Sequence, residues 1–441
     1  MSHPMTAGPS PARPSHTPKR DATGYGRLVR DGHYEQAPSG LWGKYDHVRR
    51  IWEDQVTRFA IRGALDEHVR QARQAGRGLR VIDLGCGSGE GWDLLCKVPV
   101  GAQAGGGRYV LGPDDLAAYH GIDLCPDMVA ACCASFQDRP QASFAQGDLN
   151  DLAGHLRRLQ PFDLYYNSYG SLSHLADDGL RRLVSATLDH QSGPLTLVID
   201  VHGQFSPEWP GYWGYSRDAT APRMQPYNMV WMYPEAERAR RLEEQRNYRI
   251  RYWRGEELRS FLLDIPGVGD RLRDLTLCDR SVLVGRHMDT ACFDPQARPV
   301  RREVNTLFEF NTAARLDLLS VPPMPASGDA TVDVFFRDYA RAWDAVVSWF
   351  SNLLQGVQAP SPADLCGAGG PIPAILQQGM QAITEAARQL AWFDPGDPEA
   401  NLLQPQLGLL LRQLEYHLQR GLGCGHGLLA VLQLGSTSGR H

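Results

Sequence analysis

Residues 81–91 read Val-Ile-Asp-Leu-Gly-Cys-Gly-Ser-Gly-Glu-Gly, and this stretch decides the fold class. A short apolar run ends in glycine and a helical pattern begins at Glu90, which predicts a strand–turn–helix unit of a parallel α/β sheet. Glycines at 85, 87 and 89 allow a tight turn in which backbone amides approach a ligand closely. The dinucleotide fingerprint would need a third glycine at position 90, and no GxxxxGK[ST] sequence occurs, so the turn does not indicate a phosphate cradle.

The α/β rhythm continues on both sides of this unit. The expected elements are a helix at 45–73, strands at 119–124, 143–145, 162–167 and 194–201, and helices at 126–137, 151–159 and 177–190. Five strands that alternate with helices predict one doubly wound, Rossmann-like α/β sheet.

Three carboxylates stand at the expected carboxyl ends of the first three strands. Asp83 ends the first strand and is expected to face a cationic amine or its bridging water. Asp123 closes the second strand, where two vicinal ribose hydroxyls can donate to it. Asp148 follows the third strand, where it can accept from an exocyclic amine of adenine. Each acid alone is more often a helix cap or a turn residue, but the ordered set favours a ligand site.

With these residues in place, the sequence resembles the class I S-adenosylmethionine-dependent methyltransferases. The motifs DLGCGSG, GIDLCPDM, QGDL and FDLYYNSYGSLSHL occur in the family's order over residues 79–201. The resemblance implies S-adenosylmethionine as cofactor and does not specify the acceptor. The cofactor-binding residues that it implies are Asp83, Gly85, Cys86, Gly87, Gly89, Asp123, Met128, Asp148, Leu149 and Asn167.

Candidates for the acceptor side follow the fourth and fifth strands. His174 and His202 are the two expected catalytic bases, since an imidazole titrates near neutral pH. A histidine that caps a helix is an equally good interpretation of His174, and an acceptor that needs no base is a further alternative. The sequence Asn167-Ser-Tyr-Gly departs from the [ND]PP[YF] motif of enzymes that methylate adenine or glutamine amino groups.

The helix at 45–73 folds across the cofactor in similar enzymes. One of Lys44, Tyr45 and Arg49 is expected to reach the methionine carboxylate, although a solvated helix face is the favoured interpretation of Arg49. Cys424 and His426 are two potential ligands without further partners, so a loop is favoured over a metal site and no metal is expected.

The rest of the chain is expected to add an insertion and a helical domain. Residues 204–275 are rich in aromatic side chains and predict a substrate-side lid, in which 228–233 and 247–253 resemble strands. The run SVLVGR at 281–286 is expected to complete the sheet. Helices are expected at 301–320, 331–355, 372–393 and 401–433. The predicted organisation is a disordered tail at 1–20, a methyltransferase domain at 21–290 and an all-helical C-terminal domain at 291–441.

Composition narrows the function classes. The 441 residues hold 45 Lys and Arg against 50 Asp and Glu, so the net charge of −5 argues against a chain that mainly grips nucleic-acid backbone. No stretch approaches 18 uninterrupted apolar residues, the N-terminus lacks a signal-peptide core, and nine cysteines without a CxxC pair are typical of reduced thiols. A cytoplasmic protein without a membrane span is therefore expected.

These observations predict an S-adenosylmethionine-dependent methyltransferase that acts on a small molecule, plausibly in specialised metabolism. The C-terminal helices are the expected surface for a homodimer. Two alternatives stay open: an RNA or protein methyltransferase whose helical domain recognises the substrate, and a cofactor-binding scaffold without turnover.

Overall fold

The computed structural model describes residues 19–35, 40–101, 108–112, 114–214, 223–242, 248–321, 323–392 and 396–437. Its centre is a mixed nine-stranded sheet. Five parallel strands form one half of this sheet in the order β3 (Ala142–Gln146), β2 (Leu116–Asp123), β1 (Leu79–Leu84), β4 (Leu164–Tyr166) and β5 (Leu195–Gly203). The chain winds outward from β1 in one direction and then crosses to β4, so the expected doubly wound Rossmann-like sheet is confirmed.

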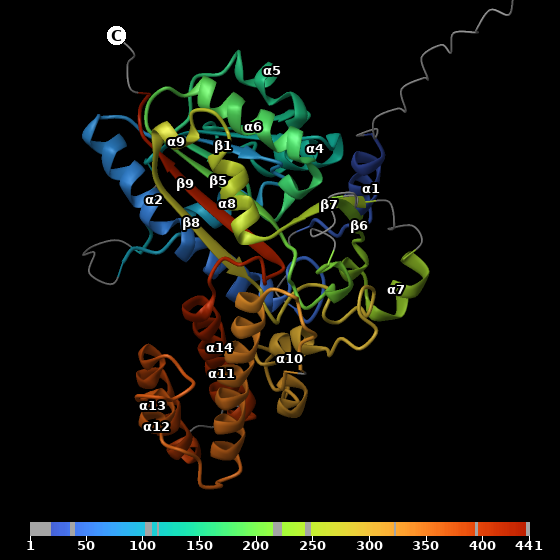
Figure 1. Cartoon of the computed structure of the whole chain (residues 1–441), viewed down its shortest axis with the longest axis vertical. Helices are drawn as coiled ribbons and strands as arrows, with labels where there is room; N and C mark the ends of the chain where they lie inside the picture. The colour runs from blue at the N-terminus through green and yellow to red at the C-terminus, as the bar shows by residue number, and fades with distance from the viewer. Residues whose placement is uncertain are drawn as a thin grey trace, which may run out of the picture.

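Two long strands complete the sheet beyond β5. Strand β9 (Gly427–Leu434) runs antiparallel to β5, and β8 (Leu272–Arg280) runs antiparallel to β9. In Figure 1 the last strand of the chain, β9, lies between β5 and β8 in the interior of the sheet. The C-terminal segment is therefore part of the central sheet.

A short hairpin stands on the carboxyl end of β5. Strand β7 (Tyr248–Trp253) pairs in parallel only with His202 and Gly203, and β6 (Met224–Tyr227) pairs antiparallel with β7. The hairpin thus extends the sheet past the end of the short strand β4. It forms a wall above the edge where ligands bind in open α/β sheets.

Apolar side chains of the strands alternate between two helical layers. Val81 faces the core shared with α2 (Asp54–Gln74) and α3 (Glu90–Cys96). Its neighbour Ile82 faces the core shared with α5 (Leu152–Leu156), α6 (Asp177–His190) and α8 (Gly255–Leu263). This alternation follows from the two-residue repeat of a strand that is buried on both faces.

Helices between β8 and β9 form the expected helical region, seen below the sheet in Figure 1. They are α10 (Val300–Thr306), α11 (Ala330–Leu354), α12 (Pro362–Cys366), α13 (Gln377–Arg388) and α14 (Gln404–Leu418). The ring of Trp343 in α11 lies 6.0 Å from that of Trp52, which belongs to the helical turn Val48–Glu53 that leads into α2. The helical region therefore shares its core with one face of the sheet.

The helix expected at 401–433 is wrong in its last part, because the helix ends at Leu418 and residues 427–434 are strand β9. Gly421 and Gly423 have positive φ, which breaks the helix. The carboxylate of Asp279 accepts the backbone N–H groups of Leu422, Gly423 and Cys424 and holds the turn into β9. The helical region is thus an excursion between β8 and β9, and residues 427–434 lie in the sheet.

Two expected strands are also misplaced. Residues 281–286 do not complete the sheet, because Ser281 has a φ of 60° and the N–H groups of Ser281 and Val282 donate to Glu415 instead of a neighbouring strand. The strand expected at 228–233 lies slightly earlier, as β6, and Val230–Met232 form a helical turn.

Only the last two residues of the tail expected at 1–20 belong to the described part of the chain. Residues 1–18 of the expected tail lie outside the described residues, and helix α1 (Lys19–Arg30) begins where the tail was expected to end. Within the described part of the chain, no helix is both long enough and apolar enough to span a bilayer.

Candidate active site

A cavity of about 530 Å³ opens at the carboxyl edge of the parallel strands, where the chain switches from β1 to β4. Seven of the ten predicted cofactor-binding residues line it: Gly85, Cys86, Gly87, Asp123, Met128, Asp148 and Leu149. Both predicted bases, His174 and His202, line the same cavity. The fold therefore brings residues at or just after the carboxyl ends of all five parallel strands to one site, as expected at a switch point.

The glycine turn needs its glycines for two different reasons. All three have positive φ, with values of 79° at Gly85, 54° at Gly87 and 91° at Gly89. A Cβ at Gly85 would lie 2.7 Å from Ser171, and one at Gly89 would lie 2.6 Å from the Phe136 ring, so these two positions are closed by packing. A Cβ at Gly87 would meet nothing closer than Glu90 at 3.5 Å. The space beside Gly87 therefore belongs to the cavity.

Asp123 holds the glycine turn as well as facing the cavity. Its Oδ2 accepts the N–H of Gly87 at 2.9 Å, and its Oδ1 accepts the N–H of Cys125 at 2.8 Å. Burial raises the pKa of Asp123. Each carboxylate oxygen has a second lone pair. The side chain can therefore accept two ligand hydroxyls while it keeps both backbone bonds.

Asp148 both caps a helical turn and lines the cavity, which are the two roles that its sequence position allowed. It caps the helical turn Leu149–Asp151, because Oδ1 accepts both the backbone and the side-chain N–H of Asn150 at 2.9 Å. Asp148 and Leu149 also line the cavity. The cap leaves Oδ2 for an amino group of a ligand.

The Asp123→Ala protein is expected to bind S-adenosylmethionine more weakly by roughly 10- to 150-fold, because hydrogen bonds to a charged acceptor are worth about 1.5–3 kcal/mol. Isothermal titration calorimetry measures this directly. Asp127→Ala is the matched control, since Asp127 lies on the next helix, pairs with Arg30 and does not line the cavity. Unchanged affinity in the Asp123 variant would remove the ribose assignment.

Three predicted residues lie behind the cavity wall. Asp83 is fully buried beneath the first turn of α3, where it accepts a hydrogen bond from the hydroxyl of Tyr119. Asn167 is fully buried and donates to the carbonyl of Leu84 at 2.5 Å. Gly89 faces Phe136. In this geometry, Asp83, Asn167 and Gly89 therefore do not face a ligand in the cavity. They support the glycine turn from below.

Asp83 makes folding stability depend on pH. Burial raises its pKa to about 7. Because the folded pKa exceeds the unfolded one, the unfolded state binds fewer protons, so stability falls as the pH rises from about 4 to about 7. Relative to Asp83→Asn, the wild-type free energy of unfolding is expected to fall by about 2–3 kcal/mol between pH 5 and pH 8. Urea denaturation of both proteins tests this, and parallel pH profiles would contradict it.

Glu90, which replaces the third glycine of a dinucleotide fingerprint, anchors the N-terminal segment over the turn. It pairs with Lys44 and accepts from Tyr45 at 2.6 Å and from Ser88 at 2.8 Å. Burial alone would raise the pKa of Glu90, but Lys44 and Arg49 lower it to about 2. Burial also lowers the pKa of Lys44 to about 8. This ion pair lies beside Gly87 and was not expected from the glycine pattern.

The expectation of a solvated Arg49 is wrong. Arg49 lies on the cavity wall with its side chain only 4% exposed, and its guanidinium stacks on the ring of Tyr169 at 3.3 Å. Tyr169 follows β4 and has a positive φ of 63°, and its N–H donates to Asp200. The loop after β4 therefore covers the helix face that carries Arg49.

The two predicted histidines have different partners. Nε2 of His174 lies 3.0 Å from the hydroxyl of Tyr25 in α1. Nδ1 of His202 lies 3.0 Å from the hydroxyl of Ser173, which also accepts the backbone N–H of His202. Burial lowers the pKa of His202 well below its usual range, and the neighbouring His426 adds to this effect. His202 is therefore neutral near pH 7.

A third histidine, His426, was expected to be a loop residue and lies beside His202. His426 directly precedes β9, lines the cavity, and lies edge-on to His202 with ring centres 4.8 Å apart. Its Nδ1 is 2.8 Å from Oε2 of the buried Glu208. A carboxylate that orients an imidazole is a common arrangement for a general base. Only the antiparallel return of β9 brings His426 here, so no local signal in the sequence could have indicated it.

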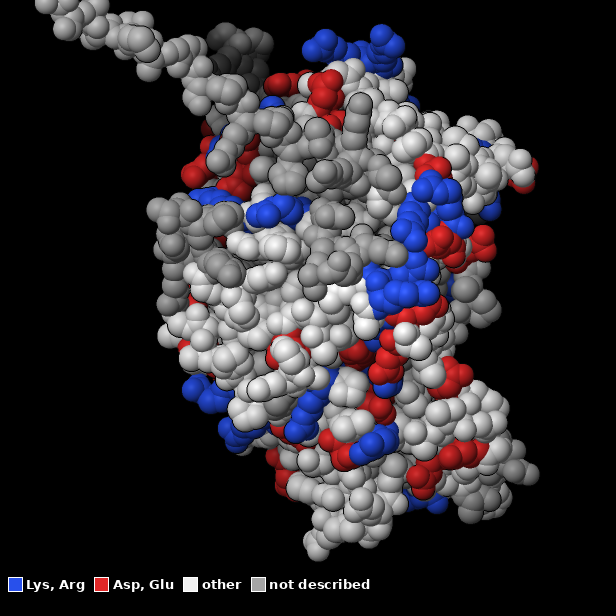
Figure 2. Space-filling model, turned by 90° about the vertical axis from the view of Figure 1, so that its right-hand side faces the viewer, with Lys and Arg blue, Asp and Glu red and all other residues white. Residues whose placement is uncertain are grey.

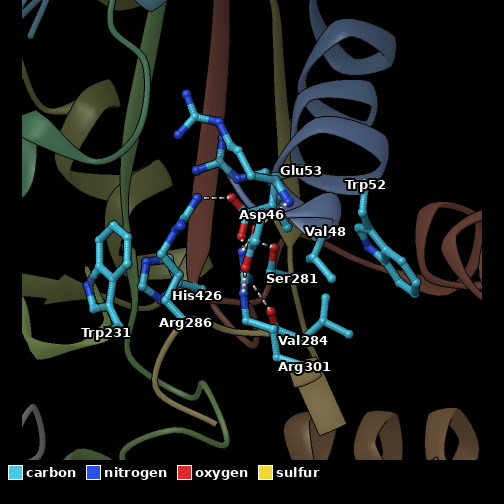
Figure 3. Close-up of polar contacts among 12 residues, drawn as sticks. Asp46, Val48, Trp52, Glu53, Trp231, Ser281, Val284, Arg286, Arg301 and His426 are labelled. Carbon is cyan, nitrogen blue, oxygen red and sulfur yellow. Dashed lines mark hydrogen bonds and ion pairs between the residues drawn. The ribbon is translucent and has the colours of Figure 1, made fainter. Parts of the chain in front are cut away.

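Three buried arginines, Arg49, Arg280 and Arg286, form part of the cavity wall and are called the arginine layer below. In Figure 3, Arg286 extends between Trp231 and Glu53, and His426 lies beside it. Glu53 accepts from Arg286 at 2.7 Å and from Arg301 at 2.7 Å. Arg301 in turn is held by both oxygens of Asp46. The layer is therefore fixed by a buried network of ion pairs that links the start of α2 to α10.

No protein-family model and no curated protein matches the chain. Similar solved structures include an S-adenosylmethionine-dependent methyltransferase from Clostridium acetobutylicum ATCC 824, at 12% identity over 59% of this chain and 90% of that chain with a TM-score of 0.30. Another from Methanosarcina mazei matches at 13% identity over 46% and 84%, with a TM-score of 0.31. The CurJ carbon methyltransferase, at 16% identity and a TM-score of 0.23, matches 29% of this chain and 30% of its own.

The likeness thus spans about a third of the CurJ chain and, at 32%, of monomeric WbdD. The order and directions of the strands define a Rossmann-like α/β sheet. The chain adds a helical region to this sheet, between its last two strands β8 and β9.

Among the described residues, no group of three or more His, Cys, Asp or Glu side chains could hold a metal ion. Cys424 is fully buried and His426 is engaged with Glu208.

Proposed function

We propose that the protein is an S-adenosylmethionine-dependent methyltransferase that acts on a small-molecule acceptor. The observation that carries the proposal is the joint placement of the glycine turn, Asp123 and Asp148 at one end of a cavity whose other end holds three histidines. S-adenosylmethionine supplies an electrophilic methyl group on a cationic sulfur. Carboxylates and a close backbone suit such a ligand, which carries no pyrophosphate.

The residues present fit this cofactor. Free space beside Gly87 admits a ligand against the backbone, and Asp123 offers lone pairs for the ribose hydroxyls. Asp148 and Leu149 lie where the adenine would be held, and Lys44 lies near the turn where it can meet the methionine carboxylate. We propose these cofactor contacts for the individual residues.

A small acceptor is supported by the enclosure of the other end of the cavity. Strand β6 and the turn that directly follows it contribute Tyr227, Met229 and Trp231, all buried, to the wall. Alignment of the acceptor and exclusion of water are the main contributions that such a wall makes to an in-line methyl transfer. His174, His202 or His426 would remove a proton from a hydroxyl or ammonium acceptor.

The two alternatives are an RNA or protein methyltransferase and a cofactor-binding scaffold without turnover. They predict different surfaces and different transfer products. On the face that Figure 2 shows, Lys and Arg side chains of the described residues gather in one band on the right-hand side, bordered by Asp and Glu, and elsewhere they lie scattered among acidic side chains. This mixture favours a small acceptor over RNA, whose backbone requires a basic surface.

The proposal is tested in two steps. Calorimetry with S-adenosylhomocysteine first measures cofactor binding by the purified protein. Tritium transfer from labelled S-adenosylmethionine into a metabolite fraction then measures turnover. Label that disappears after ribonuclease would identify an RNA substrate, label on protein would identify a protein substrate, and cofactor binding without any transfer would identify a scaffold.

A further inference from the structure

The carboxylates that pair with Arg49 and Arg280 lie behind the arginine layer. Nε of Arg49 donates to Asp54 at 2.8 Å, and Nη2 of Arg280 pairs with Asp200 at 2.7 Å. Neither Asp54 nor Asp200 lines the cavity, whereas both arginines do. Each pair therefore presents its positive side to the cavity, and the negative charge stays on the far side of the wall.

Arg49 keeps unused hydrogen-bond donors in this wall. Its side chain is only 4% exposed, and it is fixed by Asp54 at Nε and by the ring of Tyr169. Within the described residues, neither terminal nitrogen of Arg49 has a hydrogen-bond acceptor, although the guanidinium stays charged. Two parallel N–H groups at the end of a fixed guanidinium match the two oxygens of a carboxylate or phosphate.

Arg286 provides a second cation with free capacity. It stacks on Trp231 at 4.3 Å, and its terminal nitrogens donate to Glu53 at 2.7 Å and to the carbonyl of Gly43 at 3.3 Å. No acceptor among the described residues meets its Nε. Glu53 also accepts from Arg301, so its single charge is shared by two guanidinium groups. Arg301 is also held by both oxygens of Asp46, so Glu53 and Asp46 together balance the charges of Arg286 and Arg301. What Arg286 offers the cavity is therefore its unused Nε–H donor.

The other ionisable groups that line the cavity determine which charges surround the N–H donors of Arg49 and Arg286. Burial lowers the pKa values of His202 and His426, so both rings are neutral near pH 7 and add no charge. The carboxylates Asp123 and Asp148 lie at the end of the glycine turn, where the cationic sulfur of the cofactor is expected. Glu53 and Glu90 also line the cavity; Glu90 is paired with Lys44 and lies near enough to Arg49 to stabilise its charge. The acceptor end therefore offers an anion the unused N–H donors of Arg49 and Arg286.

We propose that the methyl acceptor is an anionic small molecule whose carboxylate or phosphate group is bound by Arg49 and Arg286. This inference rests on the proposed function, because it assigns the acceptor class of the same cavity. The aromatic rings of Tyr227 and Trp231 cover the apolar part of such a molecule. The methionine carboxylate of the cofactor is a second source of the same chemistry, and Lys44, which is bonded to Glu90 beside the glycine turn, is better placed to receive it.

The test compares anionic and neutral probes of the same shape. Calorimetry on the full chain saturated with S-adenosylhomocysteine measures the binding of benzoate, phenyl phosphate and neutral benzamide. At least one anion is expected to bind about tenfold more tightly than benzamide, as for a charge-assisted hydrogen-bonded pair. Arg49→Gln is expected to abolish this preference, and Arg49→Lys is expected to retain part of it.

Arg286 requires a balanced variant, because removal of the arginine alone would leave Glu53 with one partner fewer. The double variant Glu53→Gln, Arg286→Gln removes one charge of each sign and is expected to lose the anion preference. Arg315→Gln is the control, since Arg315 pairs with Asp317 on the surface. Thermal denaturation of each variant establishes that it is folded.

The outcomes separate this inference from the proposed function. Equal binding of benzoate, phenyl phosphate and benzamide to the wild type, or an anion preference that survives in both the Arg49 and the double variant, would overturn the inference alone. An Arg49→Gln protein that loses affinity for S-adenosylhomocysteine but keeps the anion preference would assign Arg49 to the cofactor and also overturn it. Failure of the wild type to bind S-adenosylhomocysteine would reject the proposed function, and titration of the unloaded protein would still measure the anion preference.

Discussion

The Gly87→Val protein is expected to fold and to bind S-adenosylhomocysteine more weakly than the wild type by roughly 100-fold or more, equivalent to about 2.7 kcal/mol. Gly87 has a φ of 54°, in the left-handed region, and it lines the cavity. Because no atom of the described residues lies closer than 3.5 Å to an added Cβ, the valine methyl groups would occupy the ligand space instead of the protein core. Calorimetry measures the affinity, and circular dichroism establishes that the fold is intact.

Gly76→Val is the matched control for backbone strain. Gly76 follows α2 with a φ of 63°, and a Cβ there would meet no atom within 4 Å. A non-glycine residue in the left-handed region costs roughly 1–2 kcal/mol at either site. Both variants should therefore lose similar stability, while only Gly87→Val loses the cofactor. Equal cofactor affinity in the two variants would contradict the role assigned to the glycine turn.

The parallel half of the sheet could be predicted from sequence because its strands have local signals. Strands β1, β4 and β5 are apolar runs, the shorter signals of β2 and β3 end at an aspartate and before Gly147, and a helical pattern follows each strand except β5. Strand β9 has no such signal. Its residues, Gly427–Leu434, are apolar on both faces, since both faces of this interior strand are buried, and such a run has no periodicity that separates strand from helix. Its neighbours β5 and β8 are distant in sequence.

Seven of the ten residues expected at the cofactor line the cavity, but only the structure separates Asp83 from Asp123. Both carboxylates end a strand and precede a turn. Asp83 lies beneath the first turn of α3, where Tyr119 reaches it, whereas Asp123 points to the N–H of Gly87 at the cavity. Which of two strand-ending acids is covered depends on the helix packed above it, and that information is not local.

The acceptor end could not be predicted, because its wall is assembled from distant segments. Arg280 ends β8, Arg286 follows it in a loop, and His426 precedes β9 after the whole helical region. Arg49 was expected to be solvated because neither Tyr169 nor the helical region was known to lie over the start of α2. If residues 272–280 had been predicted as a strand, Arg280 would have been placed at the carboxyl edge of the sheet. That position would have suggested the arginine layer.

The His174→Ala protein is expected to transfer methyl groups about 10²–10⁴-fold more slowly at saturating substrate, the usual range for loss of a general base, with nearly unchanged cofactor affinity. His174 follows β4 and lines the cavity, and the hydroxyl of Tyr25 lies at its Nε2. Burial lowers the pKa of His202 and of His426 well below the usual range, which makes both weaker proton acceptors near neutral pH. Single-turnover kinetics over a range of pH provide the measurement.

His190→Ala controls for the loss of any partly buried histidine, because His190 is bonded to Tyr165 and to the carbonyl of Leu159, away from the cavity. If kcat of the His174 variant barely changes, or falls only together with thermal stability as in the control, His174 is structural. The same substitution at His202 and His426 then decides between the remaining imidazoles, with Glu208→Gln expected to reproduce the loss only if His426 is the base. Three silent histidines would mean that the enzyme works by alignment and exclusion of water on an acceptor that needs no base, such as a carboxylate oxygen held by the arginine layer.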